Sequence, residues 1–186
     1  KTVRRQRQMC IRDSAYKDYF RWVATGLEEP MTTHADRFKF NTGYGMSAYD
    51  KGSIFLSQLQ YIIGKENFDK TLKKYFNDWS FRHPKPNDFI RSAEKVSGLE
   101  LDWYLLDWAQ STMTIDYSIN SVYFVDNRTK IILKRIGQMG MPIDIRIIFE
   151  SGDYLDYNIP MTKMRGSKPV SYTHLRAHET SGSLVC

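Results

Sequence analysis

The apolar side chains between residues 47 and 111 recur every three or four positions, which is the spacing of one face of an α-helix. Four segments show this period: 47–64, 66–79, 88–98 and 103–111. The first and the third end in a glycine, as many helices do. Because the connections between the segments are short, they predict four helices in an antiparallel bundle or a layered array.

Polar residues next to these segments indicate where the helices begin. Asn87 and Asp102 are expected to cap the third and fourth helices through their side chains. Upstream, residues 15–25 are predicted to be the end of another helix, which Gly26 stops. Residues 26–47 are rich in Gly, Pro, Thr and Asn. They are predicted to form a long loop, a kind of segment that often surrounds a site.

The hydrophobic period changes from that of a helix to that of a strand at about residue 114. Ile143, Ile145 and Ile147 alternate with polar residues, which predicts a strand with one buried face. We therefore predict an α+β protein. Its helical part would occupy residues 15–113, and an incomplete antiparallel β domain would occupy residues 114–169.

The two ends of the chain carry sequences that translation of a sequencing adapter would produce. The DNA ATGTGTATAAGAGACAG reads Met-Cys-Ile-Arg-Asp-Ser in one frame, as in residues 9–14. Its reverse complement reads Val-Ser-Tyr-Thr-His in another frame, as in residues 170–174. We therefore predict that residues 1–14 and 170–186 are adapter-derived scars outside the natural protein.

Most of the positive charge of the chain lies in these ends. The whole chain has a formal charge of +6, and residues 1–14 hold five Lys or Arg and one Asp. Residues 15–169 therefore carry only +2, which removes the main argument for a nucleic-acid partner. Both cysteines also lie in the ends. No apolar run reaches the roughly 20 residues of a membrane span, so no span is expected in this segment.

The common catalytic motifs are absent from the sequence. There is no HExxH, GxSxG, P-loop or CxxC, so neither a metal ligand nor a catalytic thiol is expected in this chain. His34 and His83 are predicted to be loop histidines. His174 and His178 are four residues apart, as zinc ligands on a helix are. However, they fall in the adapter-like tail, and the acidic residue follows the wrong histidine.

One short segment does carry a family pattern. The sequence YDKG at residues 49–52, with Tyr44 five residues before it, resembles the signature of the aminopeptidase N-like zinc metallopeptidases, the gluzincin family. Asp50 replaces the Glu that is usual in this signature. The helical region that follows and the stretch MGMPIDIRIIFESGD are similar to the family's helices and small β domain. The resemblance covers nearly all of residues 15–169.

The resemblance implies a thermolysin-like catalytic domain followed by a small antiparallel β-sandwich-like domain. It also implies a Zn²⁺ cofactor whose ligands, with a general-base Glu, would lie upstream of residue 15. Tyr49 would donate a hydrogen bond to the oxyanion of the tetrahedral intermediate, a task that suits a neutral tyrosine hydroxyl. Tyr44 would line the cleft that binds the peptide substrate.

Spacing alone favours plainer roles for the same residues. Tyr49 would be a tyrosine packed at a helix start, Tyr44 an aromatic residue packed in a loop, and Lys51 a solvated charge. We also expect Leu59 and Ile62 to lack packing partners in this chain and to form an exposed apolar face. A chain with such a face would be marginally stable on its own.

Two functions fit these observations. The first is a fragment of a zinc aminopeptidase, which would be inactive by itself because the zinc motif lies outside it. The second is a non-catalytic relative that binds peptides or acts as a scaffold. An HExxH upstream of this segment would favour the enzyme. Substrate preference, cellular location and oligomeric state are not indicated by the sequence.

Overall fold

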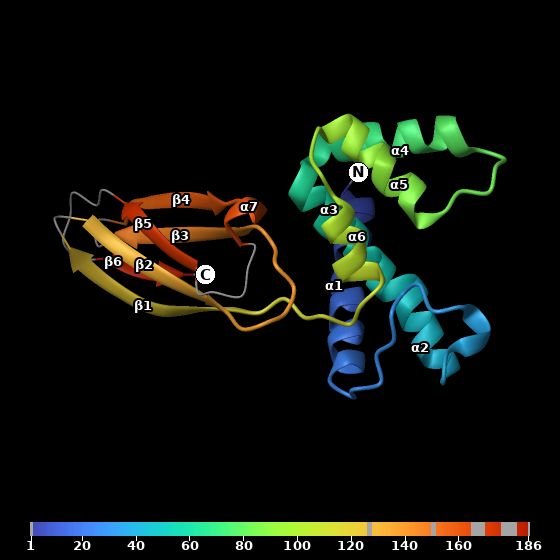
Figure 1. The fold of residues 1–186 in the computed structure, drawn as a ribbon, viewed down its shortest axis with the longest axis horizontal. Helices are drawn as coiled ribbons and strands as arrows, with labels where there is room; N and C mark the ends of the chain where they lie inside the picture. The colour runs from blue at the N-terminus through green and yellow to red at the C-terminus, as the bar shows by residue number, and fades with distance from the viewer. Residues whose placement is uncertain (1, 126–127, 150–151, 165–169, 176–181, 186) are drawn as a thin grey trace. The chain divides into compact units, whose positions relative to one another are not determined.

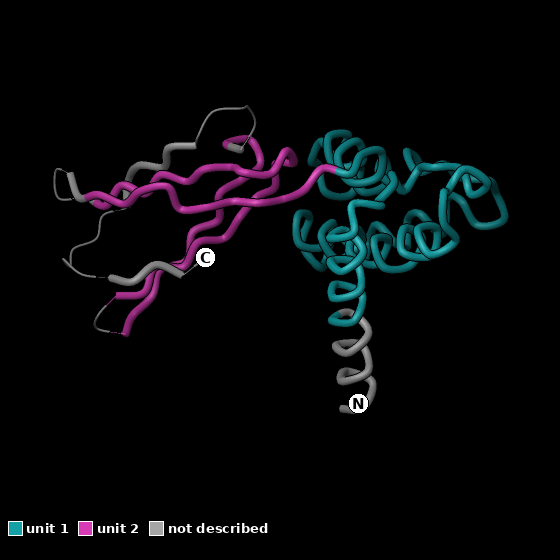
Figure 2. The backbone as a smooth tube through the Cα atoms, turned by 90° about the horizontal axis from the view of Figure 1, so that it is seen from below, with its two compact units in different colours: residues 1–112 teal, residues 113–186 magenta. Residues whose placement is uncertain are grey.

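A computed structural model of the chain describes residues 2–125, 128–149, 152–164, 170–175 and 182–185. The chain divides into two units, residues 1–112 and residues 113–186, which are coloured separately in Figure 2. The first unit is helical and the second is built from strands (Figure 1). This arrangement confirms the predicted α+β class. The prediction that both ends are adapter-derived stays a prediction.

The helical unit begins with a long helix, α1, at Thr2–Val23. A largely irregular segment follows, and then helical turns succeed one another almost without a break. The elements after α1 are η1 (Ala35–Arg37), α2 (Asn41–Gly45), η2 (Met46–Lys51), α3 (Gly52–Ile63), α4 (Lys65–Trp79), α5 (Pro86–Ser97) and α6 (Asp102–Ala109). The four predicted amphipathic helices are confirmed as α3 to α6.

The predicted loop at residues 26–47 is right only as far as Phe40. Helical backbone begins at Asn41 and continues into α3 without an intervening loop. Two glycines in this stretch argue against a helix by intrinsic propensity. Packing overrides that preference, because η2, which contacts α2 and continues its helical backbone, lies against α1. At Gly43, a Cβ atom would lie 3.2 Å from Cζ2 of Trp22, so this close approach favours glycine.

Both predicted helix caps are wrong by one or two residues. The N-cap of α5 is Lys85, with Pro86 in the first helical position, where its missing N–H costs nothing. The backbone N–H of Lys85 donates to Oδ2 of Asp88 at 2.8 Å. Asn87 therefore lies inside the first turn. Asp102 is the first residue of α6 and makes no cap hydrogen bond, since Leu101 is the N-cap residue.

The core of the helical unit forms where α3 meets α6. The fully buried Tyr104 packs its ring 4.9 Å from that of Phe55 and donates its hydroxyl proton to the Phe55 carbonyl at 2.6 Å. Leu59 is also fully buried, so the prediction that it would lack packing partners is wrong. Ile62 is partly buried. Burying one such side chain contributes about 1.5–3 kcal/mol.

The second unit contains two three-stranded antiparallel sheets. The first sheet has the order β1 (Tyr117–Val125), β2 (Arg128–Arg135) and β5 (Val170–Leu175). The second has the order β4 (Tyr154–Ile159), β3 (Ile143–Phe149) and β6 (Gly182–Val185). A short helix, α7 (Met161–Met164), follows β4.

The two sheets share one apolar core, as the sandwich-like prediction requires. Ile145 and Ile147 of β3 are buried with Ile131 and Leu133 of β2 and Ile159 of β4. The intervening residues of β3 are more exposed, so the predicted alternation is confirmed. Among the helices that the structure describes, none combines the length and the apolar character that crossing a membrane requires.

Candidate functional site

Tyr49 lies on the turn η2, which has π-helical hydrogen bonding. Its side chain is 76% exposed. The residues two positions before and after it, Ser47 and Lys51, are buried. The turn therefore presents Tyr49 to solvent, while the buried side chains of Ser47 and Lys51 anchor the turn to the protein. The backbone N–H of Gly52 donates to the carbonyl of Tyr49 and joins the turn to α3.

The π-helical geometry of this turn is an informative departure from the expected α-helix. Such segments are rare and occur mostly as single turns, frequently at functional sites. The sequence pattern gave no indication of it. Its presence at residues 46–51, around the YDKG signature, marks the same segment that the resemblance singled out.

Tyr44 lies one turn earlier, on α2, and is 43% exposed. The edge of its ring packs against Phe38, with the ring centroids 5.7 Å apart. Among the described residues, no hydrogen bond or ring contact joins Tyr44 to Tyr49. The two tyrosines are thus presented separately on one continuous stretch of helical backbone.

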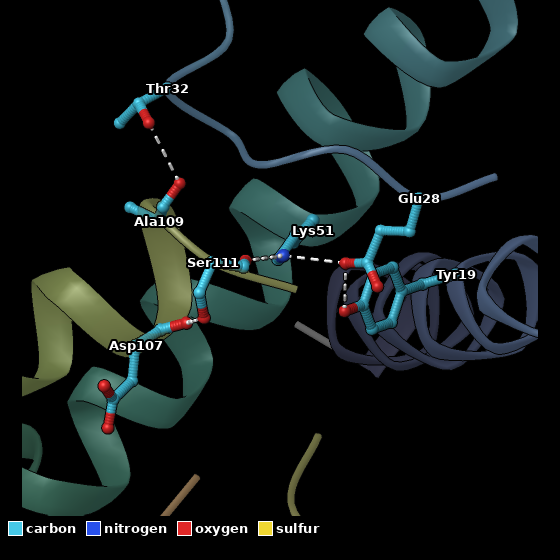
Figure 3. A network of polar contacts seen from close by, with 7 residues as sticks. All are labelled: Tyr19, Glu28, Thr32, Lys51, Asp107, Ala109 and Ser111. Carbon is cyan, nitrogen blue, oxygen red and sulfur yellow. Dashed lines mark hydrogen bonds and ion pairs between the residues drawn. The ribbon is translucent and has the colours of Figure 1, made fainter. Parts of the chain in front are cut away.

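Lys51 is not the solvated charge that its place in the sequence suggests. Its side chain is only 2% exposed, and its Nζ atom lies 2.7 Å from Oε1 of Glu28. The same ammonium donates to the carbonyl of Ser111 at 3.2 Å. Figure 3 shows the ammonium between these two oxygen atoms. Lys51 thus joins the turn η2 to the loop after α1 and to the chain after α6.

Glu28 has a second partner on α1. The hydroxyl of Tyr19 donates to the same Oε1 atom at 2.8 Å, and the Lys51 ammonium lies 5.9 Å from the centre of the Tyr19 ring. Burial, and then the hydrogen bond to Glu28 and its charge, raise the pKa of Tyr19 far above its ordinary value. Tyr19 therefore stays protonated and remains a donor to the carboxylate (Figure 3).

A further contact fixes the loop beside this network. The backbone N–H of Thr32 donates to the carbonyl of Ala109 at 3.1 Å, and the hydroxyl of Thr32 lies 3.3 Å from the same oxygen. Sequence analysis missed this network, because Glu28 and Lys51 are 23 residues apart with no regular spacing between them. The Lys of the YDKG signature was the one available clue.

The surroundings of Asp50 disfavour its ionised form, whereas an ion-pair partner would favour it. Burial, followed by the charge of Asp18, raises the pKa of Asp50 above its ordinary value of 3.8. Because the pKa is higher in the folded state, ionised Asp50 opposes folding above that pKa, and the effect disappears at pH values below the ordinary one. Asp50→Asn should therefore raise the melting temperature at neutral pH and change it little below pH 3.8.

Asp78→Asn provides a control with the opposite sign. A hydrogen bond from Lys74 lowers the pKa of Asp78, so ionisation of Asp78 favours folding and its removal should lower the melting temperature at neutral pH. Circular dichroism melts of the wild type and of both variants, from neutral pH to below pH 3.8, compare the three melting temperatures. A melting temperature of Asp50→Asn below that of the wild type at neutral pH would contradict the assignment.

The histidines do not form a metal site in the described part of the chain. His34 is exposed and its Nδ1 atom accepts from the backbone N–H of Asp36, and His83 is exposed in the connection between α4 and α5, so both are loop histidines as predicted. His174 lies in the strand β5, and His178 lies outside the described residues. Within the described ranges, no group of three His, Cys, Asp or Glu side chains could hold a metal ion.

Comparisons with known proteins match this chain to a peptidase family and to aminopeptidases. Residues 8–126 match the Peptidase family M1 domain. Aminopeptidase N of Escherichia coli K12 is 26% identical over 73 residues, which are 39% of this chain and 8% of that protein. Glutamyl aminopeptidase of Homo sapiens is 31% identical over 83 residues, which are 45% of this chain and 8% of that protein. The matched segments thus span about a twelfth of the length of these relatives.

The fold also has a counterpart among solved structures. The crystal structure of aminopeptidase A from Legionella pneumophila, in complex with aspartic acid, superposes with a TM-score of 0.56 at 22% sequence identity. The superposition covers 77% of this chain and 17% of that protein. At this identity, the likeness concerns the fold and shows that the arrangement of helices and strands is a known one.

Proposed function

The chain belongs to peptidase family M1, and from this premise we propose that it is part of a zinc-dependent aminopeptidase that hydrolyses peptide bonds. The observation that carries the proposal is the placement of Tyr49. Its side chain is exposed on a π-helical turn in which Ser47 and Lys51, two positions before and after it, are buried. A residue packed for stability alone would be buried instead.

In the proposed reaction, Tyr49 acts on the tetrahedral intermediate. Attack of water on the scissile carbonyl places negative charge on the former carbonyl oxygen. A hydroxyl that donates to this oxygen stabilises the transition state more than the ground state, because the charge develops only during the reaction. Tyr44, on the preceding turn, is proposed to contact the peptide substrate on the same side.

The proposal requires a zinc ion that the described residues of this chain do not hold. They contain no cluster of side chains suited to a metal. From its place in family M1, we propose that the zinc ligands and the general base belong to another part of the full-length protein. What this chain contributes is the oxyanion donor and the framework that presents it.

Metal removal from the full-length protein tests the proposed function. We expect dialysis against a chelator to abolish hydrolysis of an aminoacyl-4-nitroanilide and one equivalent of Zn²⁺ to restore it. Full-length protein that binds peptides but has no metal-dependent hydrolysis would favour the non-catalytic, peptide-binding relative instead. Retention of hydrolysis in metal-free protein would rule out the zinc mechanism.

A further inference from the structure

We propose that Lys51 is a positioning residue for Tyr49, and that its buried ion pair with Glu28 fixes the orientation of the turn η2. The inference rests on the proposed function, since it assigns Lys51 a role in the same reaction. Lys51 does not reach the reacting atoms. It acts through the backbone of the turn that carries the tyrosine hydroxyl.

Buried and exposed side chains alternate along the turn in a way that holds Tyr49 outward. Ser47 and Lys51 are 5% and 2% exposed, whereas Tyr49, midway between them, is 76% exposed. Two inward side chains thus flank one outward side chain on a single turn. Releasing the side chain at position 51 would remove one of the two anchors that fix the orientation of the turn, and with it the orientation of Tyr49.

Lys51 is held by acceptors from more than one segment of the helical unit. Its ammonium contacts the Glu28 carboxylate at 2.7 Å and the Ser111 carbonyl at 3.2 Å, and these acceptors come from separate segments. Glu28 is in turn held by the hydroxyl of Tyr19 on α1. Charge-assisted hydrogen bonds of this kind are short and directional. Together these hydrogen bonds fix the position of the turn relative to α1 and to Ser111, which follows α6 (Figure 3).

A side chain that only fills space at position 51 would not need a charge. A buried ammonium and a buried carboxylate carry large desolvation costs, and an apolar pair of similar volume often gives equal or greater stability. The network instead supplies a defined geometry beside the exposed tyrosine. Geometry matters at this site, because a displacement of about 1 Å can reduce a reaction rate by about 100-fold.

A double-mutant cycle in the full-length protein tests this inference. The four proteins are the wild type, Tyr49→Phe, Lys51→Met and the double variant, compared by kcat and KM with an aminoacyl-4-nitroanilide. If Lys51 acts through the Tyr49 hydroxyl, Lys51→Met lowers kcat by about 10-fold to 100-fold with little change in KM. In the Tyr49→Phe background, Lys51→Met then has almost no further effect on kcat.

Additional variants keep the test decisive. Lys70→Met removes an exposed lysine that pairs with Glu66 on α4, and it should leave kcat unchanged. If Lys51→Met does not fold, Glu28→Gln takes its place in the cycle, because it removes the charge and retains an acceptor for Lys51 and Tyr19. Equal losses of kcat in both Tyr49 backgrounds would overturn the positioning role, as would a parental kcat for Lys51→Met. Parental activity of Tyr49→Phe would instead overturn the proposed role of Tyr49 itself.

Discussion

Lys51→Met is expected to lower the free energy of unfolding of the helical unit by about 3–5 kcal/mol. The substitution leaves the Glu28 carboxylate buried without its ion-pair partner, since the side chains of Lys51 and Glu28 are only 2% and 8% exposed. Domains of ordinary stability unfold with about 5–15 kcal/mol, so the loss is a large share of the total. Urea denaturation of the chain, followed by circular dichroism at the helix band, measures it.

Two further variants distinguish the loss of the buried ion pair from the general effect of removing a lysine. Replacing both partners, Lys51→Met with Glu28→Met, should cost much less than Lys51→Met alone, because no unpaired charge is left in the protein interior. Lys70→Met removes an exposed i,i+4 pair and should cost less than about 1 kcal/mol. A similar small loss for Lys51→Met would show that its ammonium is solvated, contrary to the structure.

Tyr49→Phe is expected to lower kcat of the full-length protein by about 100-fold to 1,000-fold while KM changes little. The substitution removes one hydroxyl and keeps the ring. Because that ring is exposed and its hydroxyl has no hydrogen bond within the described residues, the fold should lose little stability. Steady-state kinetics with an aminoacyl-4-nitroanilide measures both constants.

Tyr154→Phe is the matched control for this change. Tyr154 is an exposed tyrosine on β4, in the other unit of the chain, and its ring lies against the Arg146 guanidinium. Removal of its hydroxyl should change kcat by less than about 2-fold, as expected for an exposed residue with no proposed part in the reaction. Equal kcat values for Tyr49→Phe and Tyr154→Phe would show that the Tyr49 hydroxyl takes no part in the reaction.

Much of the fold follows from hydrophobic periodicity. The amphipathic helices and the alternating strand of residues 143–149 appear where the pattern predicts them, because each buries one face. The errors lie where tertiary packing decides. Residues 41–47 are helical despite two glycines, since Gly43 lies close to Trp22 of α1 and the following turn, η2, packs against α1. Leu59 is fully buried on α3, a helix that packs against α1 and α4 and receives the Tyr104 hydroxyl of α6 at the Phe55 carbonyl.

The site was predictable in part. The YDKG signature drew attention to Tyr49, and the structure gives it an exposed side chain, whereas its catalytic role stays a prediction. Nothing in the local sequence distinguishes a buried Lys51 from a solvated one. Its environment depends on Glu28 and Ser111, which the fold brings from positions 23 and 60 residues away. Such contacts have no period that a single sequence could reveal.

The affinity of full-length Tyr49→Phe for a phosphinic dipeptide reports on the oxyanion contact itself, because the tetrahedral phosphorus of this inhibitor resembles the intermediate. A donor to the oxyanion binds this inhibitor more strongly than it binds the planar substrate. We predict that Tyr49→Phe binds the inhibitor about 100-fold more weakly than the wild type, with KM for the substrate nearly unchanged. Wild-type affinity for the inhibitor in Tyr49→Phe would contradict the claim that Tyr49 stabilises the oxyanion.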